Sequence, residues 1–172
     1  QRPQGWAVSR DSLDNLTFSE GDSIYGRNAL RLVNSVEIKQ GRELRIPGGD
    51  ITLSCYVKTE IDTAESLSEL YDATDAGLIL VLHYADNEID SLGIGFPKNT
   101  GAEWARVSLT ANVSKEPNRF EVFIVNRLST SYIVDLPMIE GSKSPGQWSP
   151  SIDDVPTYTT NPFKSVTGVQ VI

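Results

Sequence analysis

Residues 132–154 read Tyr132-Ile-Val-Asp-Leu-Pro-Met-Ile-Glu-Gly-Ser-Lys-Ser-Pro-Gly-Gln-Trp-Ser-Pro-Ser-Ile-Asp-Asp154. Apolar residues dominate from Tyr132 to Ile139 and predict a β-strand, which turns at Gly141. The polar loop that follows leads to Trp148, which stands before a Ser-Pro pair. We interpret this segment as a final strand that sends a loop back onto the body of the domain, with Trp148 holding the loop in place.

The rest of the chain shows the alternation with period two that half-buried strands require. In Ile51-Thr-Leu-Ser-Cys-Tyr-Val-Lys58 one face is apolar and includes Cys55, while the other carries Tyr56 and Lys58. Gly77-Leu-Ile-Leu-Val-Leu-His-Tyr84 is apolar on both faces and predicts a central strand. Roughly eight to ten short strands without a long helix predict an all-β fold, an antiparallel β-sandwich.

Further strands are expected wherever an alternating segment is bounded by Gly, Pro, Asn or Ser. We interpret Gly41 as a break between two of them. In Phe120-Glu-Val-Phe-Ile-Val-Asn-Arg127 either alternate set fits the core, and we take Phe120, Val122 and Ile124 as the inward set. The expected strands are 29–34, 36–39, 43–46, 91–96, 104–113, 119–128 and 130–140.

The closing segment resembles that of the carbohydrate-binding-module-like jelly rolls in bacteriophage tail, baseplate and fibre proteins. The resemblance extends to Ala29-Leu-Arg-Leu-Val-Asn34, Ile51-Thr-Leu-Ser-Cys-Tyr-Val-Lys58 and Glu103-Trp-Ala-Arg-Val-Ser-Leu-Thr110. It implies a jelly roll of the galactose-binding-like type in residues 1–154. Residues 155–172 then form a Pro- and Thr-rich connector that ends in one possible extra strand.

Composition excludes several classes of function. The formal net charge of −8 argues against a nucleic-acid partner, which needs a basic surface. No apolar run approaches the roughly 20 residues that span a bilayer, so membrane insertion is not expected. A single cysteine, Cys55, provides neither an internal disulfide nor a thiolate metal cluster, and its apolar face predicts a buried thiol.

Catalytic motifs are absent from the sequence, and we expect no enzyme activity. The chain has no Gly-x-Ser-x-Gly elbow, no phosphate-binding glycine loop and no paired-histidine metal motif. His83 is the one histidine, and either a structural role or a ligand contact fits its position within a strand. Pairs of carboxylates suited to glycoside hydrolysis depend on three-dimensional distances, which sequence does not give.

Carbohydrate binding needs aromatic rings for the apolar faces of sugars and planar polar groups for their hydroxyls. Strand parity directs several such side chains away from the core. For Trp104 edge packing is an equal alternative. We predict that six residues line the exposed face of one sheet and contact sugar: Tyr56, His83, Trp104, Arg106, Glu121 and Arg127.

The resemblance also implies a structural calcium ion, with an acidic ligand on the last strand. Asp135 matches that position, and Asp22 and Glu20 are the proposed partners. Pro137 interrupts the strand next to Asp135, which departs from the family pattern. The acidic residues between Glu60 and Asp90 have two interpretations, a solvated loop or further oxygen ligands for calcium.

The function that the resemblance implies is adhesion. The chain would be a non-catalytic carbohydrate-binding module in the tail of a virion, made in the bacterial host cytoplasm and acting at the host cell surface. Its partners would be host cell-wall polysaccharide, or another glycan, and other tail and baseplate proteins. The alternatives are a structural spacer without sugar binding and an accessory module of a bacterial glycosidase.

Overall fold

The computed structural model describes residues 6–8, 15–20, 22–24, 28–43, 49–60, 66–67, 69–147 and 170–171. Trp148 and most of the predicted connector 155–172 lie outside the described residues, so the structure does not test their predicted roles. The described strands are β1 (Ala7–Val8), β2 (Leu16–Glu20), β3 (Asn28–Leu32), β4 (Val36–Glu43), β5 (Gly49–Thr59), β6 (Ala76–His83), β7 (Ile89–Gly95), β8 (Ala105–Val113), β9 (Arg119–Asn126), β10 (Tyr132–Glu140) and β11 (Gln170–Val171).

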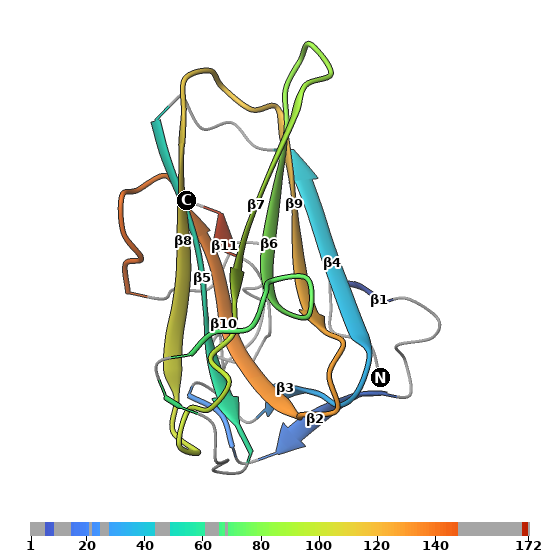
Figure 1. The fold of residues 1–172 in the computed structure, drawn as a ribbon. Coiled ribbons are helices and arrows are strands. Elements are labelled where there is room, and N and C mark those ends of the chain that lie inside the picture. The colour runs from blue at the N-terminus through green and yellow to red at the C-terminus, as the bar shows by residue number, and fades with distance from the viewer. Residues whose placement is uncertain are drawn as a thin grey trace, which may run out of the picture.

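The strands form two sheets that pack face to face, as Figure 1 shows nearly edge on. Sheet A has the order β1-β4-β9-β6-β7, and sheet B has the order β2-β3-β10-β5-β8. Neighbouring strands are antiparallel, except that β11 pairs in parallel with β10. The chain crosses from sheet to sheet at almost every connection from β3 to β10, which is the arrangement of a jelly roll. The predicted all-β sandwich is confirmed.

The core lies between the sheets and is built from the inward side of each strand. On β5 the predicted apolar face of Ile51, Leu53, Cys55 and Val57 is completely buried. Sheet A contributes Leu78, Leu80 and Leu82 from β6 and Phe120, Val122 and Ile124 from β9. The choice of Phe120, Val122 and Ile124 as the inward set is therefore confirmed, as is the buried thiol of Cys55.

One predicted boundary is wrong. The sequence predicts a break between two strands at Gly41, whereas β4 runs through this residue from Val36 to Glu43. Gly41 pairs with Glu121 of β9, and the continuous ladder keeps the backbone of the glycine extended. Glycine weakens a strand through its conformational entropy, but it does not end a strand in which the residues on either side of it are paired.

The last predicted strand, β10, contains a bulge. Its register with β5 shifts between Asp135 and Met138, and Leu136 has a φ of 51°. Pro137 lies within this irregularity and has no N–H to give to the ladder. The Asp135 carboxylate accepts the backbone N–H of Leu136 at 2.9 Å, which satisfies a donor that the bulge removes from the sheet.

Two further findings concern elements outside the sheets. The described residues contain no helix that is long and apolar enough to span a membrane. Residues 69–75, between β5 and β6, follow the edge of sheet A, where Leu70 bridges to Pro97 and the Tyr71 N–H donates to the Phe96 carbonyl at 2.9 Å.

Candidate functional site

The six predicted sugar contacts do not share one face. His83 ends β6, Glu121 lies on β9 and Arg127 follows β9, all on sheet A. In contrast, Tyr56 on β5, Arg106 on β8 and Trp104 just before β8 belong to sheet B. Because the two sheets turn their outer faces in opposite directions, the prediction of one continuous surface is wrong.

The outer face of sheet B is covered along its central strand. All nine residues of β10 are buried, including Asp135 and Glu140 on its outward side. Residues 141–147 cross this face: Gly146 N–H donates to Glu140 at 2.7 Å, and the Thr52 hydroxyl donates to the Ser142 carbonyl at 2.6 Å. The predicted polar loop after the last strand is therefore present as far as residue 147, and it occupies the surface that a ligand on sheet B would need.

Arg106 holds this loop rather than facing solvent. Its Nη2 donates to the Gly146 carbonyl at 2.5 Å and to Ser54 Oγ at 3.3 Å, and its guanidinium lies 5.2 Å from the centre of the Tyr56 ring. These contacts leave Arg106 little freedom to reorient toward a ligand.

Trp104 lies at the rim of the same face and is partly exposed. The Lys58 ammonium stands 5.3 Å from its ring centre and forms an ion pair with Asp22 at 2.6 Å. Lys58 is only 16% exposed, so it is fixed over the ring rather than mobile. Edge packing, the alternative considered for Trp104, accounts for these contacts.

The outer face of sheet A is different, because its central strands carry partly exposed side chains. Register places Lys39, Phe123, Ile79 and Gly93 in one row across β4, β9, β6 and β7. The next row is Gly41, Glu121, Val81 and Ser91. We call this surface the open face; it consists of Lys39, Gly41, Ile79, Val81, His83, Ser91, Gly93, Arg119, Glu121 and Phe123.

A carboxylate surrounded by three basic groups lies at the centre of the open face. Glu121 Oε1 is 2.7 Å from His83 Nε2, and Oε2 is 3.1 Å from Lys39 Nζ and 3.4 Å from Arg119 Nη2. Burial raises the pKa of Glu121, but the hydrogen bonds from His83 and Lys39 and the charges of Lys39 and Arg119 outweigh it, so the pKa lies below its usual value. Glu121 is therefore ionised at neutral pH and fixed in orientation.

The residues beside Glu121 leave space above it. Gly41 is exposed and has no side chain to cover the carboxylate, and a methyl group placed there would lie 3.5 Å from Glu121 Cγ. Lys39 Nζ stands 5.7 Å from the Phe123 ring centre, but its side chain is 45% exposed and free to move aside. Phe123, Ile79 and Val81 provide apolar surface next to the charged groups.

Arg127 lies on the same sheet but at the opposite end of β9 from His83 and Arg119. Its guanidinium forms an ion pair with Glu37 at 3.1 Å, and its backbone N–H donates to the Asp75 carbonyl at 2.7 Å. Of the six predicted residues, the structure therefore brings together only His83 and Glu121 in direct contact on the open face.

The proposed calcium ligands do not form a cluster in the described residues. Asp135 accepts the N–H groups of Ile24 and Leu136, each at 2.9 Å, and Asp22 is paired with Lys58. The side chain of Glu20 lies outside the described part of the chain, in which no three His, Cys, Asp or Glu side chains form a metal-binding group. Because the Glu20 side chain is not described, the calcium site stays a prediction; in the described residues Asp135 accepts backbone N–H groups at the bulge and at Ile24.

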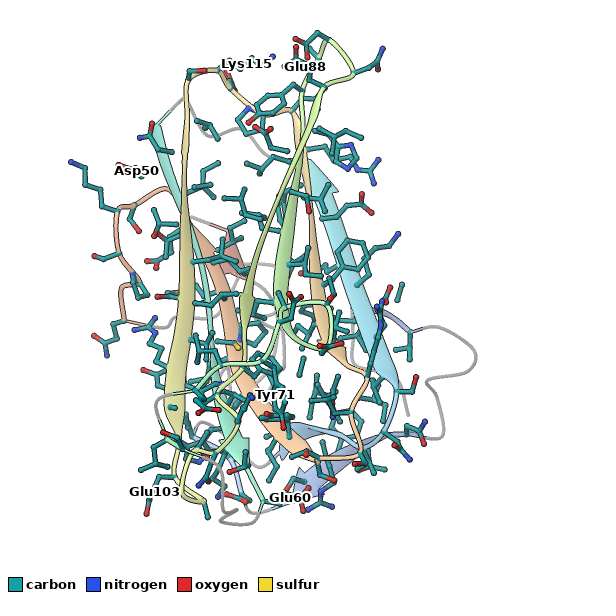
Figure 2. The ribbon with its side chains drawn as sticks, viewed as in Figure 1. Asp50, Glu60, Tyr71, Glu88, Glu103 and Lys115 are labelled. Carbon is teal, nitrogen blue, oxygen red and sulfur yellow. The ribbon has the colours of Figure 1, made fainter. Side chains whose placement is uncertain are left out.

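Lys39 and Gly41 were not among the predicted site residues, and neither were residues 70–74, which follow the edge of sheet A and include Tyr71, labelled in Figure 2. Alternation in Val36-Glu-Ile-Lys39 does place Lys39 opposite the core, so one signal was present. The sequence could not show that β4 pairs with β9, which is the pairing that brings Lys39 and Gly41 beside Glu121.

No protein-family model and no curated protein matches the sequence. Among solved structures the chain is similar to the enzymatically active domain of bacteriophage CBA120 tailspike protein 4, with a TM-score of 0.55 and 15% identity over 79% of this chain. That match spans only 19% of the tailspike chain.

Two bacterial structures are similar in the same way. The CBM22-1 xylan-binding domain from Paenibacillus barcinonensis has a TM-score of 0.52 and 12% identity, covering 79% of this chain and 85% of that one. The CBM22-1 and GH10 modules of a Clostridium thermocellum xylanase, complexed with xylohexaose, give 0.56 and 17%, covering 88% and 29%. At such identities the similarity establishes the fold alone, a jelly-roll sandwich of the kind found in carbohydrate-binding modules.

Proposed function

We propose that this chain is a non-catalytic carbohydrate-binding module whose saccharide lies on the open face of sheet A. The observation that carries the proposal is the arrangement around Glu121, where a fixed carboxylate, three basic groups and the apolar surface of Phe123, Ile79 and Val81 lie side by side. The hydroxyls of a sugar can form hydrogen bonds with the carboxylate and the basic groups, and its C–H faces can pack against the apolar surface.

The contacts available to a sugar follow from hydrogen-bonding capacity. Lysine has three N–H donors and arginine has five, so Lys39 and Arg119 retain donors after their contacts with Glu121. His83 uses Nε2 for Glu121, which leaves Nδ1 for a hydroxyl. Phe123 would pack against a sugar ring once Lys39 has moved aside.

We further propose that the module serves adhesion in a phage tail, where it would hold the virion against host cell-wall polysaccharide. The resemblance of the closing segment to phage tail jelly rolls and the structural similarity to a tailspike domain support this setting. Exposed hydroxyls exchange water for protein at small net gain, so one module binds weakly and many copies in a tail would supply avidity. The similarity to xylanase modules supports the alternative of an accessory module in a bacterial glycosidase.

A glycan array probed with the labelled domain tests sugar binding. Gly41→Leu should weaken binding at least about tenfold, because the leucine side chain would fill the space over Glu121. A tenfold loss of affinity corresponds to about 1.4 kcal/mol of binding free energy. Gly41→Ala is the matched control and should bind nearly as wild type. Phe123→Ala and Glu121→Gln should each weaken binding, whereas Trp104→Ala, on the other sheet, should not.

The alternatives give different outcomes in the same experiment. Loss of binding in Trp104→Ala with none in Gly41→Leu would place the site on sheet B. Binding to no glycan, together with no labelling of bacterial cells, would leave the structural spacer as the better explanation. Release of new reducing ends from a bound polysaccharide would contradict the non-catalytic assignment.

A further inference from the structure

A cavity of about 490 Å³ lies between residues 70–74 and the outer side of β6 and β7. Its floor includes Ile79, Ser91 and Gly93, and its wall includes Asp72 and Thr74. The volume falls within the range of roughly 300–1,000 Å³ that is usual for small-molecule sites. The cavity is separate from the Glu121 cluster, and none of the predicted site residues lines it.

The wall of the cavity is held firmly against the sheet. Backbone hydrogen bonds join Tyr71 N–H to the Phe96 carbonyl at 2.9 Å and Lys98 N–H to the Glu69 carbonyl at 2.8 Å. A methyl group at Gly95 would lie 1.5 Å from the Tyr71 carbonyl oxygen, so the loop backbone rests directly on the glycine. Residues 70–74 therefore close the open face along its β7 edge.

The cavity continues the row of the open face that contains Phe123. Ile79 pairs with Phe123 on one side and with Gly93 on the other, so it belongs to both surfaces. With strands about 4.8 Å apart, the three steps from β4 to β7 span about 14 Å. A short saccharide lying across the strands would extend from Lys39 and Phe123 over Ile79 and end against residues 70–74.

The lining suits a polyol. Asp72 Oδ1 accepts the Thr74 N–H at 2.9 Å and the Thr74 hydroxyl at 2.7 Å, which leaves Oδ2 to accept hydroxyls. These hydrogen bonds hold the pKa of Asp72 below its usual value, so the carboxylate is ionised at neutral pH. Leu70 at the rim is 51% exposed and adds apolar surface beside Ile79.

We propose that this cavity takes the terminal sugar residue of a glycan whose following residues lie on the open face. The module would then recognise chain ends rather than the interior of a polysaccharide. This inference rests on the proposed function, because the open face must bind the remainder of the chain.

Amide chemical shifts measured with free D-glucose, D-galactose, D-xylose, N-acetyl-D-glucosamine and L-rhamnose test the cavity directly. At least one of these sugars should shift the amides of Ala73, Ile79 and Gly93. Ser91→Tyr should abolish the shifts by filling the cavity. Ile89→Tyr is the matched control, because Ile89 lies on the same strand and is 58% exposed but does not line the cavity.

Asp72→Asn provides a second variant that tests chemistry rather than space. Asparagine keeps the oxygen that closes the turn with Thr74 but removes the charge. Binding should weaken while the melting temperature stays close to that of wild type. Unchanged binding in both Asp72→Asn and Ser91→Tyr would overturn the proposal.

The dependence on chain ends is tested with the array glycan that binds wild-type protein. Partial hydrolysis to half the mean length doubles the number of ends per unit mass, so the protein bound at saturation should rise about twofold. If the amount of protein bound per mass of glycan stays constant, and no sugar shifts the amide signals of Ala73 or Gly93, the recognition of chain ends is overturned. Binding on the open face would remain intact. Monosaccharide shifts at Ala73, which lines the cavity but is not part of the open face, with undiminished glycan binding by Gly41→Leu would instead keep the cavity and contradict the proposed function.

Discussion

Two glycines of sheet A differ sharply in what they permit. Gly95 supports the Tyr71 carbonyl directly, whereas Gly41 faces open space with only ordinary contacts around it. We expect Gly95→Ala to destabilise the protein by about 1–3 kcal/mol or more, since backbone on both sides leaves no flexible group to yield. Gly41→Ala should change stability by no more than about 0.5 kcal/mol. Urea unfolding of both variants measures the difference, and equal stabilities would contradict the close approach of the loop.

Cys55 offers a direct check on the packing of the core. Its side chain is completely buried, and burial raises the pKa of the thiol far above its ordinary value. The thiolate is the reactive form, so a thiol reagent should modify the native protein only as fast as it opens. Labelling followed by mass spectrometry should show slow reaction in buffer and rapid reaction in denaturant. Fast labelling in buffer would show that sheet B does not seal this position.

The segment that follows β10, residues 141–147, depends on one side chain for its position on sheet B. Arg106 joins residues 141–147 to sheet B through Gly146 and Ser54. Arg106→Met keeps most of the packing against Tyr56 but loses these charge-assisted bonds, and we expect a loss of about 1.5–3 kcal/mol. Limited proteolysis should then cut within 141–147 earlier than in wild type. An unchanged cleavage rate would mean that the other contacts of the loop hold it alone.

The predicted calcium ion would join β10 to residues 22–24. Asp135 already links the two through the Ile24 N–H. Ion binding would stabilise the native state by mass action, so chelation would lower the melting temperature and calcium would restore it. Asp135→Asn should remove that response if Asp135 is a ligand. A melting temperature that is equal in chelator and in millimolar calcium would exclude the site.

Strand parity explains why the elements were predictable and the site was not. Alternation correctly separated Phe120, Val122 and Ile124 from Glu121 and Phe123, because one side of each strand must meet the core. Parity states that a side chain points outward, but it does not state from which sheet. Tyr56 and His83 are both outward and yet lie on opposite sides of the sandwich.

At the scale of the whole molecule, jelly-roll topology separates residues that are close in sequence. The connection from β8 to β9 crosses between the sheets, so Arg106 and Glu121 lie on opposite faces of the sandwich. The prediction from strand parity assigns both to a single face. Conversely, Lys39 and Glu121 are distant in sequence and meet through the pairing of β4 with β9. Locating the open face required this long-range pairing, and the cavity beside it required the position of residues 70–74, which no alternation encodes.

The acid dependence of global stability follows from the same long-range cluster. Because the folded pKa of Glu121 lies below its unfolded value, near 4.3, the ionised carboxylate stabilises the fold above that pH, and the contribution is lost as pH falls through the folded pKa. Glu121→Gln should therefore be less stable than wild type at pH 7, by about 1–3 kcal/mol. The difference between the two proteins should shrink as the pH is lowered from about 5 toward 3. Glu103→Gln, an exposed position in the turn before β8, controls for removal of one negative charge and should be about as stable as wild type at pH 7. Urea unfolding across this range measures the effect, and a constant gap between wild type and Glu121→Gln would mean that His83, Lys39 and Arg119 do not stabilise the charged form of Glu121.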